Sequence, residues 1–255
     1  MSTVPPLVVL DAPAKLTVSL RITGVRDDGY HLLDAEMVSL DLVDTLKVFE
    51  PIGSPESVVE VVGPSGLALM VGSQETNLVN RALLLAGRSA RVRVTKRIPP
   101  GAGLGGGSAD AAAILRWAGM TDLVVASTLG ADVPFCLVGG RARVTGIGEQ
   151  VEPLAFEAAT LTLLTPPFGC STVEVYRAWD RLGGPTGAGT NDLEPAALAV
   201  EPRLVEWRDQ LADATGLRPR LAGSGSTWFV EGDFPGDQRR VVRTIPAEPA
   251  EPDCS

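Results

Sequence analysis

Five glycines follow two prolines near the middle of the chain, and this segment carries its most specific chemistry. It consists of Pro99, Pro100, Gly101, Ala102, Gly103, Leu104, Gly105, Gly106, Gly107, Ser108 and Ala109. Glycine lets backbone N–H groups point into one concave space, and the alanine-rich segment that follows predicts a helix with its own unpaired N–H groups. Such an arrangement favours anions, above all nucleotide phosphates, so we expect these residues to bind ATP.

Other phosphate-binding loops fit this segment less well. A Walker A loop ends in Gly-Lys-Ser or Gly-Lys-Thr, and no lysine follows these glycines. Gly101, Gly103 and Gly106 match a Rossmann fingerprint, but two prolines separate them from the preceding predicted strand. A protein-kinase glycine loop continues as a β-hairpin, and a flexible linker is not followed by an apolar helix.

Three side chains outside or at the end of the glycines could take part in phosphoryl transfer. Such a transfer needs the phosphates held, their charge neutralised and the accepting hydroxyl relieved of its proton. Lys15 is one of three lysines and is either a catalytic cation or a surface residue. Asp132 precedes an apolar run and is either a proton acceptor or a helix N-cap. Ser108 could offer its hydroxyl to Mg²⁺ or a phosphate, or cap the helix.

Two further patterns are weaker. His31 is the only histidine and Tyr30 one of two tyrosines, and as neighbours they could stack on and hydrogen-bond a nucleobase. Residues 223–226 are typical of a turn before a strand, and Asn191 and Asp192 of a helix cap. None of these patterns identifies a function by itself.

The glycine segment resembles the nucleotide loop of the GHMP kinases, which include galactokinase, homoserine kinase and mevalonate kinase. Further similar segments occur in family order at residues 12–16, 27–31 and 129–135 and, more loosely, 190–194 and 221–226. The Gly-Gly-Gly-Ser ending resembles the branch of that family that acts on a cytidyl diphosphate sugar alcohol. The resemblance implies ATP-dependent phosphorylation of a hydroxyl of this small molecule, in isoprenoid precursor biosynthesis, with Mg²⁺ as cofactor.

The resemblance also implies roles for individual residues. Lys15 and Asp132 are catalytic, with Asp132 accepting the hydroxyl proton; Tyr30, His31 and Thr17 bind the substrate, the first two at its cytosine. Thr17 departs from the family, because asparagine usually stands there. Between residues 117 and 128 the chain has about a dozen residues fewer than the family pattern has in the same interval, so we expect a helix there to be shortened or lost. A kinase for homoserine, mevalonate or a sugar, or a nucleotide-binding paralogue without turnover, remains an alternative.

The elements that must position these residues are mixed strands and helices. Strands are expected at residues 7–10, 16–22, 37–42, 45–49, 58–62, 91–95, 142–145, 161–165, 227–230 and 241–245, and helices at 77–86, 108–118, 172–181 and 202–211. Their irregular order favours an α+β fold. The resemblance implies an N-terminal ribosomal-protein-S5-like domain and a C-terminal ferredoxin-like domain. We expect these at residues 1–153 and 154–245, with a disordered tail at 246–255.

Composition sets the remaining expectations. A net charge of −9 argues against a general nucleic-acid or membrane-surface binder, since either needs a basic face. The three cysteines have no metal-site or disulfide spacing, and no apolar run is long enough to span a bilayer. The sequence therefore predicts a cytoplasmic enzyme that acts as a monomer or weak homodimer.

Overall fold

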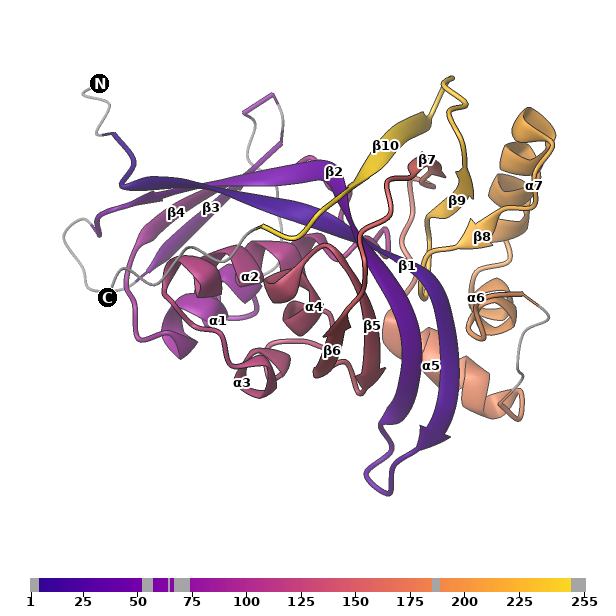
Figure 1. Cartoon of the computed structure of the whole chain (residues 1–255), viewed down its shortest axis with the longest axis horizontal. Helices are drawn as coiled ribbons and strands as arrows, with labels where there is room; N and C mark the ends of the chain where they lie inside the picture. Colours follow the sequence, from indigo (N-terminus) through magenta and orange to yellow (C-terminus); the bar gives the residue numbers. More distant parts are fainter. Residues whose placement is uncertain (1–4, 52–56, 64, 67–73, 185–188, 249–255) are drawn as a thin grey trace.

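Two long antiparallel strands dominate the computed structural model, which describes residues 5–51, 57–63, 65–66, 74–184 and 189–248. Strands β1 (Val8–Val25) and β2 (His31–Phe49) pair along almost their whole length and cross the molecule (Figure 1). The sequence predicted two shorter strands in place of each. This prediction is wrong, because bulges absorb the irregular residues of β1 and β2 continues through its polar middle.

Particular residues explain why β1 and β2 each continue as one long strand. Pro13 lies in β1, which pairs only with β2 among the named strands and is thus an edge strand, the place where sheets tolerate proline. The first register shift follows at once, between Pro13 and Lys15. In β2 the turn-like Asp44 is fully buried and accepts hydrogen bonds from the backbone N–H groups of Arg97 and Ile98. That carboxylate is satisfied inside the strand and does not start a turn.

The remaining strands extend the sheet from β2. They are β3 (Val58–Val62), β4 (Arg91–Thr95), β5 (Arg141–Gly146), β6 (Gln150–Pro153), β7 (Thr160–Leu164), β8 (Arg220–Leu221), β9 (Trp228–Glu231) and β10 (Arg239–Ile245). Strand β10 pairs with β2 through Thr244 and Ile245 and with β7 through its other residues. The last strand thereby joins the sheet of the first half of the chain to that of the second. The domain division near residue 153 stays a prediction.

Helices lie in two groups. α1 (Leu78–Leu85), α2 (Gly106–Trp117), α3 (Leu123–Ser127) and α4 (Val133–Val138) pack on one side of the long strands (Figure 1). α5 (Thr172–Arg181), α6 (Glu194–Val200) and α7 (Leu204–Thr215) contact one another in order, and α7 contacts β9. The four predicted helices are confirmed as α1, α2, α5 and α7. The others are too short for a periodic pattern to reveal. Of these, α3 lies in the shortened segment of residues 117–128.

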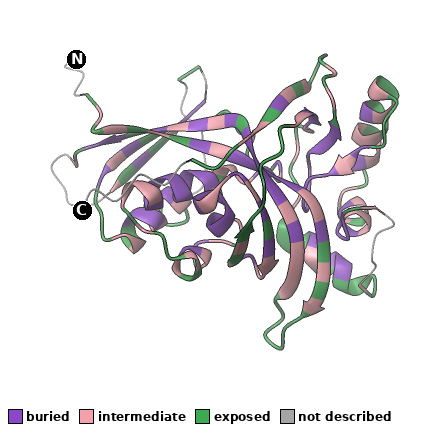
Figure 2. Ribbon diagram, viewed as in Figure 1, coloured by how far each residue is buried: buried purple, intermediate pink, exposed green. Residues whose placement is uncertain are grey.

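Helix α2 is the element that fixes the glycine segment. Its residues from Ala109 to Leu115 are all buried, and Figure 2 shows it among buried neighbours. Small alanine side chains let it lie close to β1, α1 and α4. The N-terminus of α2 is therefore held in place by the core.

The first residues of the predicted tail contact the rest of the protein. Ala247 lies against Gly140, where an added Cβ would come 2.7 Å from the Ala247 nitrogen, and Glu248 pairs with Arg116 at 3.8 Å. The rest of the predicted disordered tail, residues 249–255, lies outside the described residues.

Within the described chain, no helix combines the length and apolarity needed to cross a membrane.

Candidate active site

A cavity of about 600 Å³ opens beside the glycine segment. All residues from Pro99 to Ser108 line it, whereas Ala109, also predicted to bind ATP, is buried beneath it. Lys15, Thr17 and Asp132 line the same cavity from other elements. The structure thus brings together residues that lie more than a hundred positions apart in the sequence.

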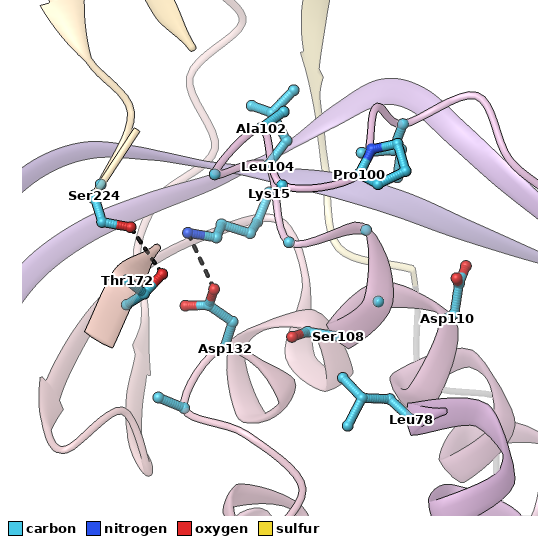
Figure 3. A pocket seen from close by; sticks show the side chains of 18 of the residues that line it. Lys15, Leu78, Pro100, Ala102, Leu104, Ser108, Asp110, Asp132, Thr172 and Ser224 are labelled. Atoms are coloured by element: carbon cyan, nitrogen blue, oxygen red, sulfur yellow. Dashed lines mark hydrogen bonds and ion pairs between the residues drawn. The ribbon is translucent and has the colours of Figure 1, made fainter. Parts of the chain in front are cut away.

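The phosphate-binding geometry comes from the start of α2. The helix begins at Gly106, two residues before the predicted start, and Gly105 occupies the N-cap position with a φ of +67°. The hydrogen bond from the N–H of Ala109 to the carbonyl of Gly105 (2.8 Å) closes the first turn, so the N–H groups before it have no acceptor within the helix. Ser108 lies inside this first turn and is not the N-cap that one interpretation expected. Its hydroxyl faces the cavity (Figure 3).

Two glycines are required by close approach as well as by positive φ. A Cβ on Gly105 would lie 2.6 Å from Cγ of Lys15, and a Cβ on Gly103 would lie 2.6 Å from the carbonyl oxygen of Gly225. Gly103 has a φ of +78°, which other residues rarely adopt. The glycine segment therefore packs directly on the catalytic candidate Lys15 and on the turn around Gly225.

Lys15 is held by three interactions. Its N–H donates to the carbonyl of Leu104 at 3.0 Å, and its Nζ donates to Oγ1 of Thr17 at 3.1 Å. The same Nζ lies 3.2 Å from Oδ2 of Asp132 (Figure 3). The bulge after Pro13 directs the chain here, and only 6% of the lysine side chain is exposed. Lys15 is therefore not a surface residue, and Thr17 contacts its ammonium group directly.

Asp132 occupies the N-cap position of α4 but makes no capping hydrogen bond with its side chain. Its carboxylate points to Lys15 instead, and its side chain is 33% exposed towards the cavity. A carboxylate that borders the cavity in this way is positioned to accept a proton from a bound hydroxyl. Nearby Cys136 offers no competing nucleophile, because burial raises the pKa of its thiol to about 12.

A second charged group lies behind the glycines and was missed in the sequence. Lys96 contacts the carboxylates of both Asp44 and Asp110, the latter at 2.8 Å, and all three side chains are buried. Burial lowers the pKa of Lys96, yet the two carboxylates raise it above its ordinary value. Burial raises the pKa of Asp110 to about 7, against the opposing effect of Lys96. The scarcity of lysine in this chain was the signal available in the sequence.

Tyr30 and His31 lie beside the cavity and do not line it. Nε2 of His31 lies 2.8 Å from Asp180, and its ring lies 4.8 Å from the ring of Tyr176 and 5.4 Å from that of Trp179. Tyr30 is exposed. Tyr176 connects this aromatic group to the cavity, which it lines. Burial, and then the charge of Asp132, raise the pKa of the Tyr176 hydroxyl, so it stays neutral.

The turn at residues 222–225 forms a further wall of the site. The hydroxyls of Ser224 and Thr172 are 2.9 Å apart, and both residues line the cavity (Figure 3). Among the described residues there is no group of three or more histidine, cysteine or carboxylate side chains that could hold a metal ion.

Comparisons with known proteins identify the family of this chain. Residues 77–140, which include the glycine segment, match the family described as GHMP kinases N terminal domain. A crystal structure of 4-(cytidine 5'-diphospho)-2C-methyl-D-erythritol kinase superposes with a TM-score of 0.69 and 32% identity, covering 93% of this chain and 99% of that one. The mevalonate kinase of Methanococcus jannaschii has a TM-score of 0.58 at 11% identity, which shows the shared fold alone. The fold and site thus define a kinase of the GHMP class.

Closer relatives narrow the class. The 4-diphosphocytidyl-2-C-methyl-D-erythritol kinase of Ruegeria pomeroyi is 38% identical, with 89% of this chain and 88% of that protein covered. The kinase of the same name from Cereibacter sphaeroides is also 38% identical, covering 93% and 94%. The chain belongs to the 4-diphosphocytidyl-2-C-methyl-D-erythritol kinase family.

Proposed function

We propose that this protein transfers the γ-phosphoryl group of ATP to the 2-hydroxyl of 4-diphosphocytidyl-2-C-methyl-D-erythritol, a step of isoprenoid precursor biosynthesis. The observation that carries the proposal is the Lys15–Asp132 pair, 3.2 Å apart, beside a cavity lined by the glycine segment. Family membership supports the choice of substrate, since the relatives bear the name of this kinase.

In this proposal the glycine segment and the N-terminus of α2 hold the ATP phosphates. Backbone N–H groups there lack helical acceptors, and the positive end of the helix dipole faces the cavity. When bound, Mg²⁺ would neutralise part of the negative charge of the phosphates. Ser108 lines the cavity and offers a hydroxyl oxygen, the kind of atom that Mg²⁺ prefers, so we assign Ser108 as a ligand of this ion.

The chemical step uses Asp132 and Lys15. Asp132 accepts the proton of the substrate hydroxyl, whose oxygen then bonds to the γ-phosphorus while the bond to the ADP oxygen breaks. The positive charge of Lys15 stabilises the negative charge on the phosphoryl group during its transfer. Thr17 fixes the lysine ammonium by accepting a hydrogen bond at 3.1 Å. Thr17 thus supports catalysis through Lys15 in addition to its proposed substrate contact.

We assign recognition of the cytosine to Tyr30 and His31. The His31 ring is oriented by Asp180 and lies in contact distance of Tyr176, which borders the cavity. An aromatic group with polar edges suits a nucleobase, which offers one flat face and several hydrogen-bonding atoms. We further propose that the enzyme works in the cytoplasm as a monomer or weak homodimer, with no nucleic-acid or membrane partner.

The test is an ADP-release assay with the cytidyl substrate, homoserine and mevalonate offered separately. We expect turnover with the cytidyl substrate to exceed that with the others by at least about 100-fold, because unpaired polar groups in the base site penalise substrates without the base. Equal or greater turnover with homoserine or mevalonate would return the protein to the general GHMP class. ATP binding without turnover of any of them would indicate a nucleotide-binding paralogue.

A further inference from the structure

Asn191 makes more hydrogen bonds than a helix cap requires. Its side-chain oxygen accepts from the N–H of Leu193 at 2.9 Å, but Leu193 is itself the N-cap of α6, so Asn191 is not the helix cap that one interpretation expected. Its side-chain nitrogen also donates to the carbonyls of Leu221 at 2.9 Å and Gly223 at 2.7 Å. The residue is only 3% exposed, so both extra bonds are buried. Asn191 therefore holds the turn at residues 222–225 as well as the start of α6.

The neighbouring Asp192 holds a different element, strand β1. Its carboxylate accepts from the N–H of Ile22 at 3.0 Å and pairs with Arg21 at 2.6 Å, and it is fully buried. Backbone bonds add to this contact, from the N–H of Leu20 to the carbonyl of Thr190 (2.8 Å) and from the N–H of Asp192 to the carbonyl of Leu20 (3.0 Å). Two adjacent residues thus connect the turn to the strand that carries the catalytic candidate.

The turn lies against the reacting groups. A Cβ on Gly223 would lie 3.8 Å from Nζ of Lys15 and 3.5 Å from Oγ1 of Thr17. The carbonyl of Gly223 is directed to Asn191, and the C=O and N–H of a trans peptide point in opposite directions. The N–H of Ser224 is therefore directed away from Asn191, and Ser224 itself lines the cavity.

We propose that Asn191 and Asp192 are positioning residues for phosphoryl transfer, which fasten the turn at 222–225 to β1 so that Ser224 faces the transferring group beside Lys15. This inference rests on the proposed kinase reaction. The turn touches the glycine segment at Gly103, whereas the N-terminus of α2, to which we assign the phosphates, is held by the core. Loss of this fastening should therefore impair the chemical step more than nucleotide binding.

The direct test is Asn191→Asp, which keeps the size and the oxygen that accepts from Leu193 but replaces the donor with a carboxylate facing two carbonyls. We expect kcat with the cytidyl substrate to fall about 100-fold while KM for ATP stays within about threefold. Asp192→Asn, which keeps an acceptor for Ile22 but weakens the pair with Arg21, should lower kcat by about tenfold. Hydrogen exchange should report faster exchange at residues 221–227 in Asn191→Asp.

Leu211→Ala is the matched control, because it removes a buried α7 side chain outside the cavity and so lowers stability alone. If Asn191→Asp lowers kcat no more than Leu211→Ala and leaves exchange at 221–227 unchanged, the proposal is overturned. Should Asn191→Asp fail to fold, Asn191→Ser and Asp192→Asn take the same measurements. If the wild type does not phosphorylate the cytidyl substrate, the proposed function fails by itself, and unchanged exchange in the variant still decides against the fastening.

Discussion

Replacing Asp132 with asparagine separates its catalytic role from a structural one. The two side chains have the same size, and the Asp132 side chain makes no capping bond that the change would break. The asparagine oxygen can still accept a hydrogen bond from Lys15, whose Nζ also donates to Thr17. Only the ability to take up a proton is lost. We expect kcat to fall by roughly 10²–10⁴-fold, the usual contribution of a positioned base.

The expected loss of stability is small. A carboxylate that is 33% exposed is screened by solvent, so its pair with Lys15 is worth about 1 kcal/mol at most. In a chain of this size that corresponds to a Tm decrease of roughly 2–4 °C. ATP affinity should stay the same or rise slightly, since one negative charge near the phosphates is removed.

The assay compares steady-state ADP release, ATP affinity by titration and Tm for the wild type and Asp132→Asn. Lys15→Met should slow the same step, and the double variant should be about as slow as the slower single variant, because the two residues act as a unit. A variant with kcat within about threefold of wild type and a clearly lowered Tm would refute the catalytic assignment and leave Asp132 a structural residue.

Three more predictions follow from the same structure. Gly105→Val should abolish ATP binding, since its Cβ would meet Cγ of Lys15 at 2.6 Å and the residue has a φ of +67°; unchanged affinity in a folded variant would contradict the phosphate assignment. His31→Ala should raise KM for the cytidyl substrate by about 10- to 100-fold and leave KM for ATP nearly unchanged, which substrate titrations would check; equal changes in both would argue against base recognition. Asp110→Asn should reduce the dependence of stability on pH. The pKa of Asp110 is raised from 3.8 to about 7 in the folded protein, so its favourable contribution is complete below pH 4 and is lost as pH rises towards 7. The variant should therefore show a flatter Tm between pH 5 and pH 8, and a Tm that falls between pH 5 and pH 8 as steeply as that of the wild type would contradict this sign.

Much of the site could be predicted from local sequence, because the glycine segment specifies its own conformation. Glycine permits the positive φ found at Gly103 and Gly105, and the alanine-rich sequence favours the helix α2. Lys15 and Asp132 were identified through the resemblance, since from spacing alone a surface lysine was as good an explanation and a helix cap was the better one. Their contact depends on a bulge in β1 and on the packing of α4, which no local pattern encodes.

The errors have a common physical origin in long-range contacts. Asp44 is typical of a turn, yet backbone N–H groups of Arg97 and Ile98 satisfy it within a continuous strand. Ser108 was a good N-cap candidate by residue type, but Gly105 takes that place because the core fixes an earlier start of α2. The buried charges around Lys96 and the double role of Asn191 likewise depend on partners distant in sequence.

The most direct test of the central claim is phosphorus NMR of the product formed by the wild-type enzyme from ATP, Mg²⁺ and 4-diphosphocytidyl-2-C-methyl-D-erythritol. We expect one new phosphomonoester signal, coupled to carbon 2 of the methylerythritol, with the diphosphate signals of the substrate retained and ADP formed in equal amount. A phosphate on another oxygen, or release of ADP with no phosphorylated product, would contradict it.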